Sequence, residues 1–275
     1  MKTELILENL PIENIPALEK IMLGHDQVDC PVIHRFSPGI YIREVSLPAG
    51  AIAIGHYQKT RHLNVFLQGM VTMFNDDGSR TDLEAPMMFT GEPGRKVGYI
   101  HENVVWLNIY PTDETDIETL ESMYLDKSEA FLEHLPEIDR TRDRDDYQQV
   151  IKETGFTDEI VKEQTENPDD QIPIPEGSYK FLIGDSDIHG KGVFATALIN
   201  KGESIGPARI KDKRTPLGRF TNHAKTPNAK MIVNGSDIIL VASRDIDGCK
   251  GGLNGEEITT DYRDNITTGE SLCQA

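Results

Sequence analysis

The chain has few cysteines, little positive charge and no long apolar run. Its three cysteines, Cys30, Cys249 and Cys273, stand far apart and form no CxxC pair. This argues against a disulfide framework and against a cysteine-only zinc site. No apolar run approaches the roughly 20 residues that a membrane-spanning helix needs. The acidic first residues, with Pro11 and Pro16, do not read as a signal peptide, so we expect a cytoplasmic location and no membrane partner.

Positive charge is scarce, because 28 Lys and Arg stand against 46 Asp and Glu in 275 residues, a formal net charge of −18. Binding to a nucleic-acid backbone needs clustered Lys and Arg, so we expect no nucleic-acid partner. The excess is concentrated between Asp113 and Asp170, where 20 acidic residues face 6 basic ones. Such a segment favours basic partners.

The N-terminal part of the sequence contains a run of predicted short strands. Segments rich in β-branched and aromatic residues, punctuated by Gly and Pro, follow one another from Val32 to Tyr110. "NDDGS", Asn75 to Ser79, is a hairpin signal because Asp-Gly tolerates positive φ. Residues 1–112 are therefore predicted to form a small barrel or sandwich.

Residues 113–175 are predicted to form an acidic helical connector. Asp113 and Glu114 suit a helix N-terminus, and Gly155 suits a helix C-cap. The acidic run is either a solvated helical face or a docking surface for a basic partner. Apolar residues recur at roughly helical spacing, namely Ile117, Leu120, Met123 or Tyr124, Phe131 and Leu135.

Histidines form the first candidate site. His56 and Gln58 lie two residues apart, so on a strand they face the same side. His62 follows after a short turn, and His101 comes from a separate strand. Imidazoles with an amide oxygen would suit Fe(II), Mn(II), Ni(II) or Zn(II). Alternatively, the histidines are residues of the barrel mouth without a ligand.

From Ile33 to Pro111 the sequence resembles the cupin superfamily in its spacing of glycines and histidines. Gln58 stands where that family has its second His, His62 where it has a Glu, and Lys96 where it has a Pro. The resemblance implies a double-stranded β-helix barrel, either with a divalent metal or metal-free. It also implies a possible homodimer through this domain.

Short strands return after residue 176, around four polar motifs. "HGKGVFAT", "RFTNHAKTPNA", "ASRDI" and "GEEITTDY" occur in this order between His189 and Tyr262. The ordered set resembles the SET domain, the fold of protein lysine methyltransferases, over Tyr179 to Asp264. The resemblance implies a minimal SET-like β fold for residues 176–275, and hence a mainly β protein.

By that resemblance, the backbone of Lys191 and Gly192 lines an S-adenosylmethionine pocket, Asn222 and His223 hold the cofactor, and Tyr262 is the catalytic tyrosine. Supporting roles fall to Arg219, Phe220, Asn228 and Glu257. The inserted region that forms much of the peptide groove in larger enzymes is short here, and no cysteine cluster follows Tyr262. The missing walls must therefore come from the barrel, the acidic helices or another subunit.

Three functions remain open from the sequence. The first is an S-adenosylmethionine-dependent lysine methyltransferase acting on a basic protein. The second is a non-catalytic binding or assembly protein, similar to accessory proteins of bacteria or phages. The third is a metal-dependent cupin enzyme regulated by its SET-like part.

Overall fold

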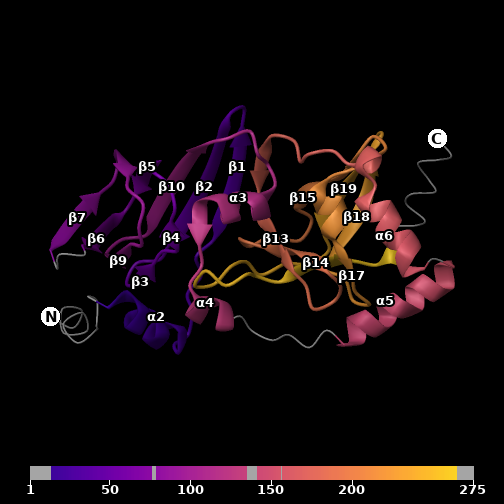
Figure 1. The fold of residues 1–275 in the computed structure, drawn as a ribbon, viewed down its shortest axis with the longest axis horizontal. Helices are drawn as coiled ribbons and strands as arrows, with labels where there is room; N and C mark the ends of the chain where they lie inside the picture. Colours follow the sequence, from indigo (N-terminus) through magenta and orange to yellow (C-terminus); the bar gives the residue numbers. More distant parts are fainter. Residues whose placement is uncertain (1–13, 76–78, 135–140, 156, 265–275) are drawn as a thin grey trace.

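Two β-rich halves lie side by side along the long axis of the molecule (Figure 1). The computed structural model describes residues 14–75, 79–134, 141–155 and 157–264. Strands dominate both halves, which confirms the predicted mainly β character. None of the helices formed by the described residues is long and apolar enough to cross a membrane. Leu135, Cys273 and the Asp-Gly pair of the predicted turn, Asp77 and Gly78, lie outside the described residues.

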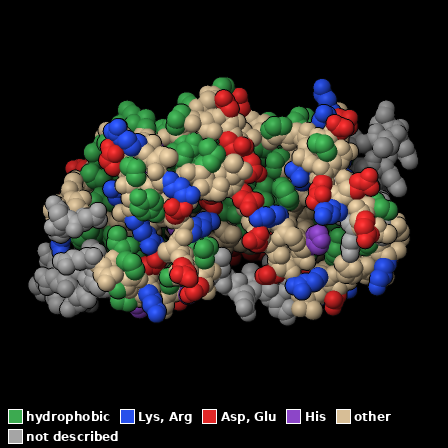
Figure 2. All heavy atoms as spheres, viewed as in Figure 1, with side chains coloured by type: hydrophobic (Ala, Val, Ile, Leu, Met, Phe, Trp, Pro, Cys, Tyr) green, Lys and Arg blue, Asp and Glu red, His purple; other side chains and the backbone are tan. Residues whose placement is uncertain are grey.

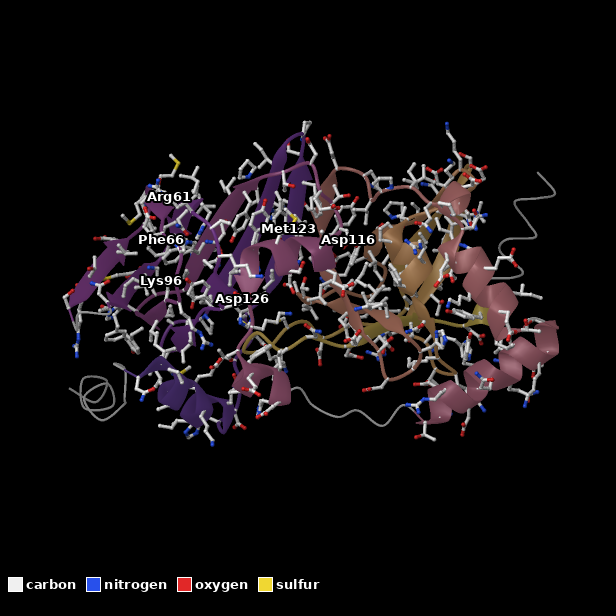
Figure 3. All side chains as sticks on the ribbon, viewed as in Figure 1. Arg61, Phe66, Lys96, Asp116, Met123 and Asp126 are labelled. Carbon is white, nitrogen blue, oxygen red and sulfur yellow. The ribbon has the colours of Figure 1, made fainter. Side chains whose placement is uncertain are left out.

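The N-terminal half is built from two sheets that enclose a core. The predicted hairpin is present, since β6 and β7 pair antiparallel and the Asn75 amide donates to the Ser79 carbonyl at 2.9 Å. Phe66, labelled in Figure 3, is fully buried between the sheets. The first sheet has the order β12 (Gly177–Tyr179), β1 (Val32–Ser37), β2 (Ile40–Leu47), β10 (Val104–Pro111), β5 (His62–Gln68) and β8 (Met87–Gly91). The second has the order β3 (Ile52–Ile54), β9 (Val97–Ile100), β6 (Met70–Phe74) and β7 (Arg80–Glu84).

The connector is partly helical, but its first predicted helix is interrupted. A two-residue strand, β11 (Leu125–Asp126), separates two helices and pairs with β4 (Tyr57–Gln58). The N-cap of the first helix is Asp116, whose Oδ1 accepts from the Thr119 amide at 2.8 Å, rather than Asp113 or Glu114. The helices of the connector are α3 (Ile117–Tyr124), α4 (Glu129–Glu133), α5 (Thr141–Thr154) and α6 (Asp158–Glu166), followed by the 3-10 turn η1 (Pro168–Asp170). Another helix, α2 (Ile15–Leu23), precedes the first strand of the barrel.

The C-terminal half contains two further four-stranded sheets. The sheet that carries the candidate site has the order β13 (Phe181–Asp185), β14 (Lys191–Ala195), β20 (Glu257–Thr260) and β17 (Asn222–His223). The other has the order β16 (Lys213–Arg214), β15 (Ser204–Ile210), β19 (Asp237–Ala242) and β18 (Ala229–Asn234). The short helix α7 (Pro216–Phe220) leads directly into β17.

The two halves share a hydrophobic core. Tyr41 and Tyr110 of the barrel belong to the same buried cluster as Val193 and Ile258 of the C-terminal half. Strand β12 extends the barrel sheet by pairing with β1. The segment between β19 and β20 reaches back to the barrel (Figure 1), where the thiols of Cys30 and Cys249 lie 3.9 Å apart. One buried cluster therefore contains residues from both sides of the predicted boundaries at residues 112 and 175.

Candidate functional site

Two polar segments, far apart in the sequence, lie next to each other in the C-terminal half. Strands β17 and β20 pair in parallel, with Asn222 opposite Thr259 and His223 opposite Thr260. Tyr262 follows two residues after β20, so it emerges beside the Asn-His pair. Helix α7 positions β17, because Thr215 caps it and its last turn ends directly before Asn222. The juxtaposition on which the predicted cofactor site depends is thus present.

Asn222 ties the turn before β14 to strand β20. Its Nδ2 lies 2.9–3.1 Å from four oxygens, those of the Lys191 and His189 carbonyls, Ser186 Oγ and Glu257 Oε1. An amide nitrogen has two protons, so it satisfies two of these acceptors at a time. Glu257 is buried with 3% of its surface exposed, and Ser186 Oγ also donates to it at 2.7 Å. The Asn222 side chain therefore shapes the turn and fixes it against β20.

His223 has a defined tautomer because of its neighbours. The Tyr262 backbone N–H donates to His223 Nδ1 at 3.2 Å, so the ring proton of a neutral His223 sits on Nε2. That Nε2 lies 2.9 Å from Asp146 Oδ2, the acceptor it needs. The fully buried imidazole consequently links β17, the residue after β20 and helix α5.

The Tyr262 hydroxyl is held as a hydrogen-bond donor. It donates to the Thr221 carbonyl at 3.1 Å, and burial raises the pKa of the phenol well above its ordinary value. A protonated phenol can polarise and orient a nearby group, but it is not a general base at neutral pH.

Helix α5 forms a wall over these residues. Tyr147 packs edge-on against Tyr262, with ring centroids 6.0 Å apart, and lies 5.3 Å from the His189 ring. Asp146 binds Arg263 as well as His223, and Arg144 donates to the Asp187 carbonyl at 2.6 Å. Both hydrogen bonds, from Arg263 first and His223 second, hold the pKa of Asp146 below its ordinary value. Part of the acidic connector thus completes the candidate site.

Lys191 and Gly192, the residues assigned to a cofactor pocket by resemblance, begin strand β14 beside Asn222. The Lys191 carbonyl faces Asn222, while its ammonium binds Glu118 of α3 and Asp185. These carboxylates, Glu118 foremost, raise the pKa of Lys191. Acidic side chains also gather over the junction between the halves in Figure 2, and Asp116, at the start of α3, lies there in Figure 3.

The predicted metal ligands of the barrel separate in the structure. His56, Gln58 and His62 line one cavity, but His101 is exposed, with its Nε2 2.7 Å from Thr72 Oγ1. Strand alternation explains this, because the preceding Ile100 points into the barrel. Gln58 Oε1 accepts from the Tyr110 hydroxyl, and His62 Nδ1 lies 2.9 Å from the Thr60 carbonyl. Across the described residues, no three His, Cys, Asp or Glu side chains gather closely enough to hold a metal ion, so the predicted set does not assemble.

The barrel nevertheless encloses a cavity of about 560 Å³. Its walls are mainly apolar and include the single tryptophan, Trp106. Polar side chains on its wall include Arg43 of β2 and Asn64 of β5. Lys96, labelled in Figure 3, also lines it. A volume of this size is typical of small-molecule sites, which span roughly 300–1,000 Å³.

No family model and no curated protein matches the sequence. Solved structures similar to part of the chain include a cupin domain from Bordetella pertussis, 14% identical, which covers 32% of this chain and 99% of that one with a TM-score of 0.27. A cupin superfamily protein from Desulfitobacterium hafniense is 16% identical over 34% of this chain and 88% of that one, with a TM-score of 0.25. A cupin-2 domain-containing protein from Shewanella frigidimarina is 16% identical over 36% and 96%, with a TM-score of 0.25. Each likeness is partial and concerns the fold alone.

Several residues of the two sites were missed from the sequence. Asp146 and Tyr147 were assigned only to an acidic helix, although Tyr147, Val150 and Ile151 recur at the i, i+3, i+4 spacing of a packed face. That spacing indicates a buried face but not what the face packs against. Arg43 carried a signal too, because it is a charged residue at an inward position of β2.

Proposed function

We propose that the C-terminal half is an S-adenosylmethionine-dependent protein lysine methyltransferase. The observation that carries the proposal is the parallel pairing of β17 with β20, which sets Asn222 and His223 beside Tyr262 and the start of β14 at Lys191. These are the residues to which the SET-domain resemblance assigns the cofactor pocket and the catalytic tyrosine.

The residues suit methyl transfer, which is an in-line attack by a neutral amine on a sulfonium methyl group. The protein must hold donor and acceptor in line and exclude water. Correct orientation of the two groups can by itself accelerate the reaction strongly. Carbonyl oxygens of the Ser186–Lys191 turn and the Tyr262 hydroxyl can orient the amine and the methyl group without acting as a strong base. Tyr147 and the acidic face of α5 supply a wall that the short C-terminal half lacks, and that face suits a basic substrate segment.

The first test measures the binding of S-adenosylmethionine to the full chain by calorimetry. We expect saturable binding and, with radiolabelled cofactor in lysate of the source cell, at least one labelled protein band. An absence of binding at millimolar cofactor would remove the proposal.

Tyr262→Phe should lower turnover by about 100-fold or more, because one positioned hydroxyl is lost from the reaction centre. Cofactor affinity should remain near that of the wild type. Tyr57→Phe is the matched control, since Tyr57 is 44% exposed on the barrel. Equal turnover of Tyr262→Phe and wild type would assign Tyr262 a structural role only.

A homodimer through the barrel remains a proposal alongside the enzyme. The outward face of the six-stranded sheet exposes three apolar side chains near one edge. They are Leu63 and Leu67 of β5 and Met88 of the edge strand β8. A second copy of the chain would cover this apolar face. Light scattering of the full chain, compared with Met88→Lys, tests it, because a dimer should shift to a monomer in the variant.

A non-catalytic binding protein is the second candidate function. It is favoured by the engagement of the Asn222 amide with protein oxygens and by the packing of α5 over the site. Ligand binding without transfer of the labelled methyl group would support it.

A further inference from the structure

A row of polar side chains crosses the inner face of the six-stranded barrel sheet. In the strand register, Arg43 of β2 lies between His34 of β1 and Asn108 of β10, and Asn108 in turn lies opposite Asn64 of β5. The neighbouring inward row contains Val32, Val45 and Trp106. A polar row thus runs beside an apolar row on the same wall of the cavity, an arrangement that can orient an amphipathic ligand.

Three nitrogen atoms at this band are buried without a hydrogen-bond partner among the described residues. They are His34 Nε2, Arg43 Nε and His56 Nδ1. All three side chains line a second, small cavity of about 10 Å³, and Arg43 and His56 also line the 560 Å³ cavity. A buried polar atom left unpaired is destabilising, so three at one place point to a bound group.

The ionisable side chains on the wall of the small cavity, besides the histidines and Cys249, are Arg43, Lys127 and Glu121, so the charge there is positive overall. Glu121 is paired with Lys127 at 2.9 Å, and Glu19 is paired with Arg95, whereas Arg43 has no ion pair among the described residues. Burial lowers the pKa of His34 to about 3 and that of His56 to about 4, so both imidazoles are neutral near pH 7. Arg43 thus presents a positive charge without an ion pair, among the described residues, to both cavities.

We propose that the barrel binds an apolar monocarboxylic acid as its anion. The apolar body occupies the cavity between Val45, Val71 and Trp106, and the carboxylate lies against Arg43 with a hydrogen bond from His56. A single free guanidinium matches one negative charge, and hydrogen bonds to charged groups are the strong ones. The carboxylate end lies beside Gly252, in the segment by which the C-terminal half reaches the barrel. The proposal is independent of methyl transfer.

The test titrates the full chain with sodium decanoate and, in parallel, with 1-decanol, which has the same tail and no charge. Trp106, the only tryptophan, lies on the cavity wall and reports binding by its fluorescence. Isothermal calorimetry gives the affinities. We expect saturable decanoate binding that is at least about tenfold tighter than that of decanol, because a charged hydrogen bond is lost in the alcohol.

Arg43→Met should weaken decanoate binding at least about tenfold and leave decanol unchanged. Arg35→Met is the control, since Arg35 lies on the adjacent strand β1 with its side chain 39% exposed and paired to Glu44. Ala53→Phe keeps the charge but fills part of the cavity, so it should weaken both ligands. This second variant and the decanoate-to-decanol ratio of the wild type decide the matter if Arg43→Met fails to fold.

The proposal is overturned if the wild type binds no decanoate, if decanoate and decanol bind equally, or if folded Arg43→Met binds decanoate like the wild type.

Discussion

Gly192 lies at the tightest point of the candidate active site. A Cβ atom added there would stand 2.9 Å from both Glu257 Cδ and Ser186 Cβ. Those two side chains, with Asn222, form the buried network that fixes the turn before β14. A glycine is therefore required by space rather than by backbone conformation.

We predict that Gly192→Ala lowers the free energy of unfolding by about 1–3 kcal/mol, as overpacking of a tight site does. Gly184→Ala is a matched control, because Gly184 is the cross-strand partner of Gly192 and its added Cβ would meet side chains only at 3.6 Å. The control should change stability by no more than about 0.5 kcal/mol. Urea denaturation of the two variants measures both values, and equal effects would contradict the packing argument.

At the scale of elements, helix α5 is held to the C-terminal half by charged contacts as well as by the packing of Tyr147. Asp146 joins it to His223 and Arg263, and Arg263 also binds Glu153 at 2.8 Å. The depressed pKa of Asp146 means that folding favours its ionised form. This stabilisation is complete above the ordinary aspartate pKa of about 4 and is lost as the pH falls through the lower value of the folded protein.

We predict that α5 loosens on acidification before the rest of the chain unfolds. Hydrogen exchange followed by mass spectrometry should show amides of residues 141–154 losing protection below about pH 4. Asp146→Asn should show faster exchange in α5 already at neutral pH, since the ion pair with Arg263 is removed. Asp145→Asn, an exposed neighbour on the same helix, is the control. Uniform loss of protection across the chain would contradict the prediction.

At the scale of the molecule, the shared core should make the two halves unfold together. The cluster joins Tyr41 and Tyr110 to Ile258, which is fully buried in β20. Strand β12 and the Cys30–Cys249 contact add further links between the halves. A cooperative transition is expected where a core is continuous.

We predict that Ile258→Ala destabilises the barrel as well as its own half, by about 2–5 kcal/mol. The single tryptophan, Trp106, reports the barrel, so its fluorescence melt should shift together with the far-ultraviolet circular dichroism melt. Ile232→Ala, at a 40% exposed position of β18, should have little effect. Two separate transitions, with Trp106 unaffected by Ile258→Ala, would show that the halves fold independently.

The sequence determined features that depend on neighbouring residues. Segments rich in β-branched and aromatic residues marked the strands, the turn signal between Asn75 and Ser79 marked the hairpin of β6 and β7, and Gly155, with a φ of +72°, ended α5 where expected. The order of the polar motifs also brought attention to Asn222, His223 and Tyr262. Such local signals act over a few residues and survive without knowledge of the fold.

Only the tertiary structure decided which distant side chains meet. It set Asp146 and Tyr147 against the Asn-His pair, turned His101 away from the other barrel histidines, and left Arg43 unpaired at the end of a cavity. These outcomes depend on strand register and on packing between segments that are distant in the sequence. His223 and Asp146, for example, are more than 70 residues apart. A pattern of neighbours fixes which face a residue occupies, but long-range pairing fixes what that face contacts.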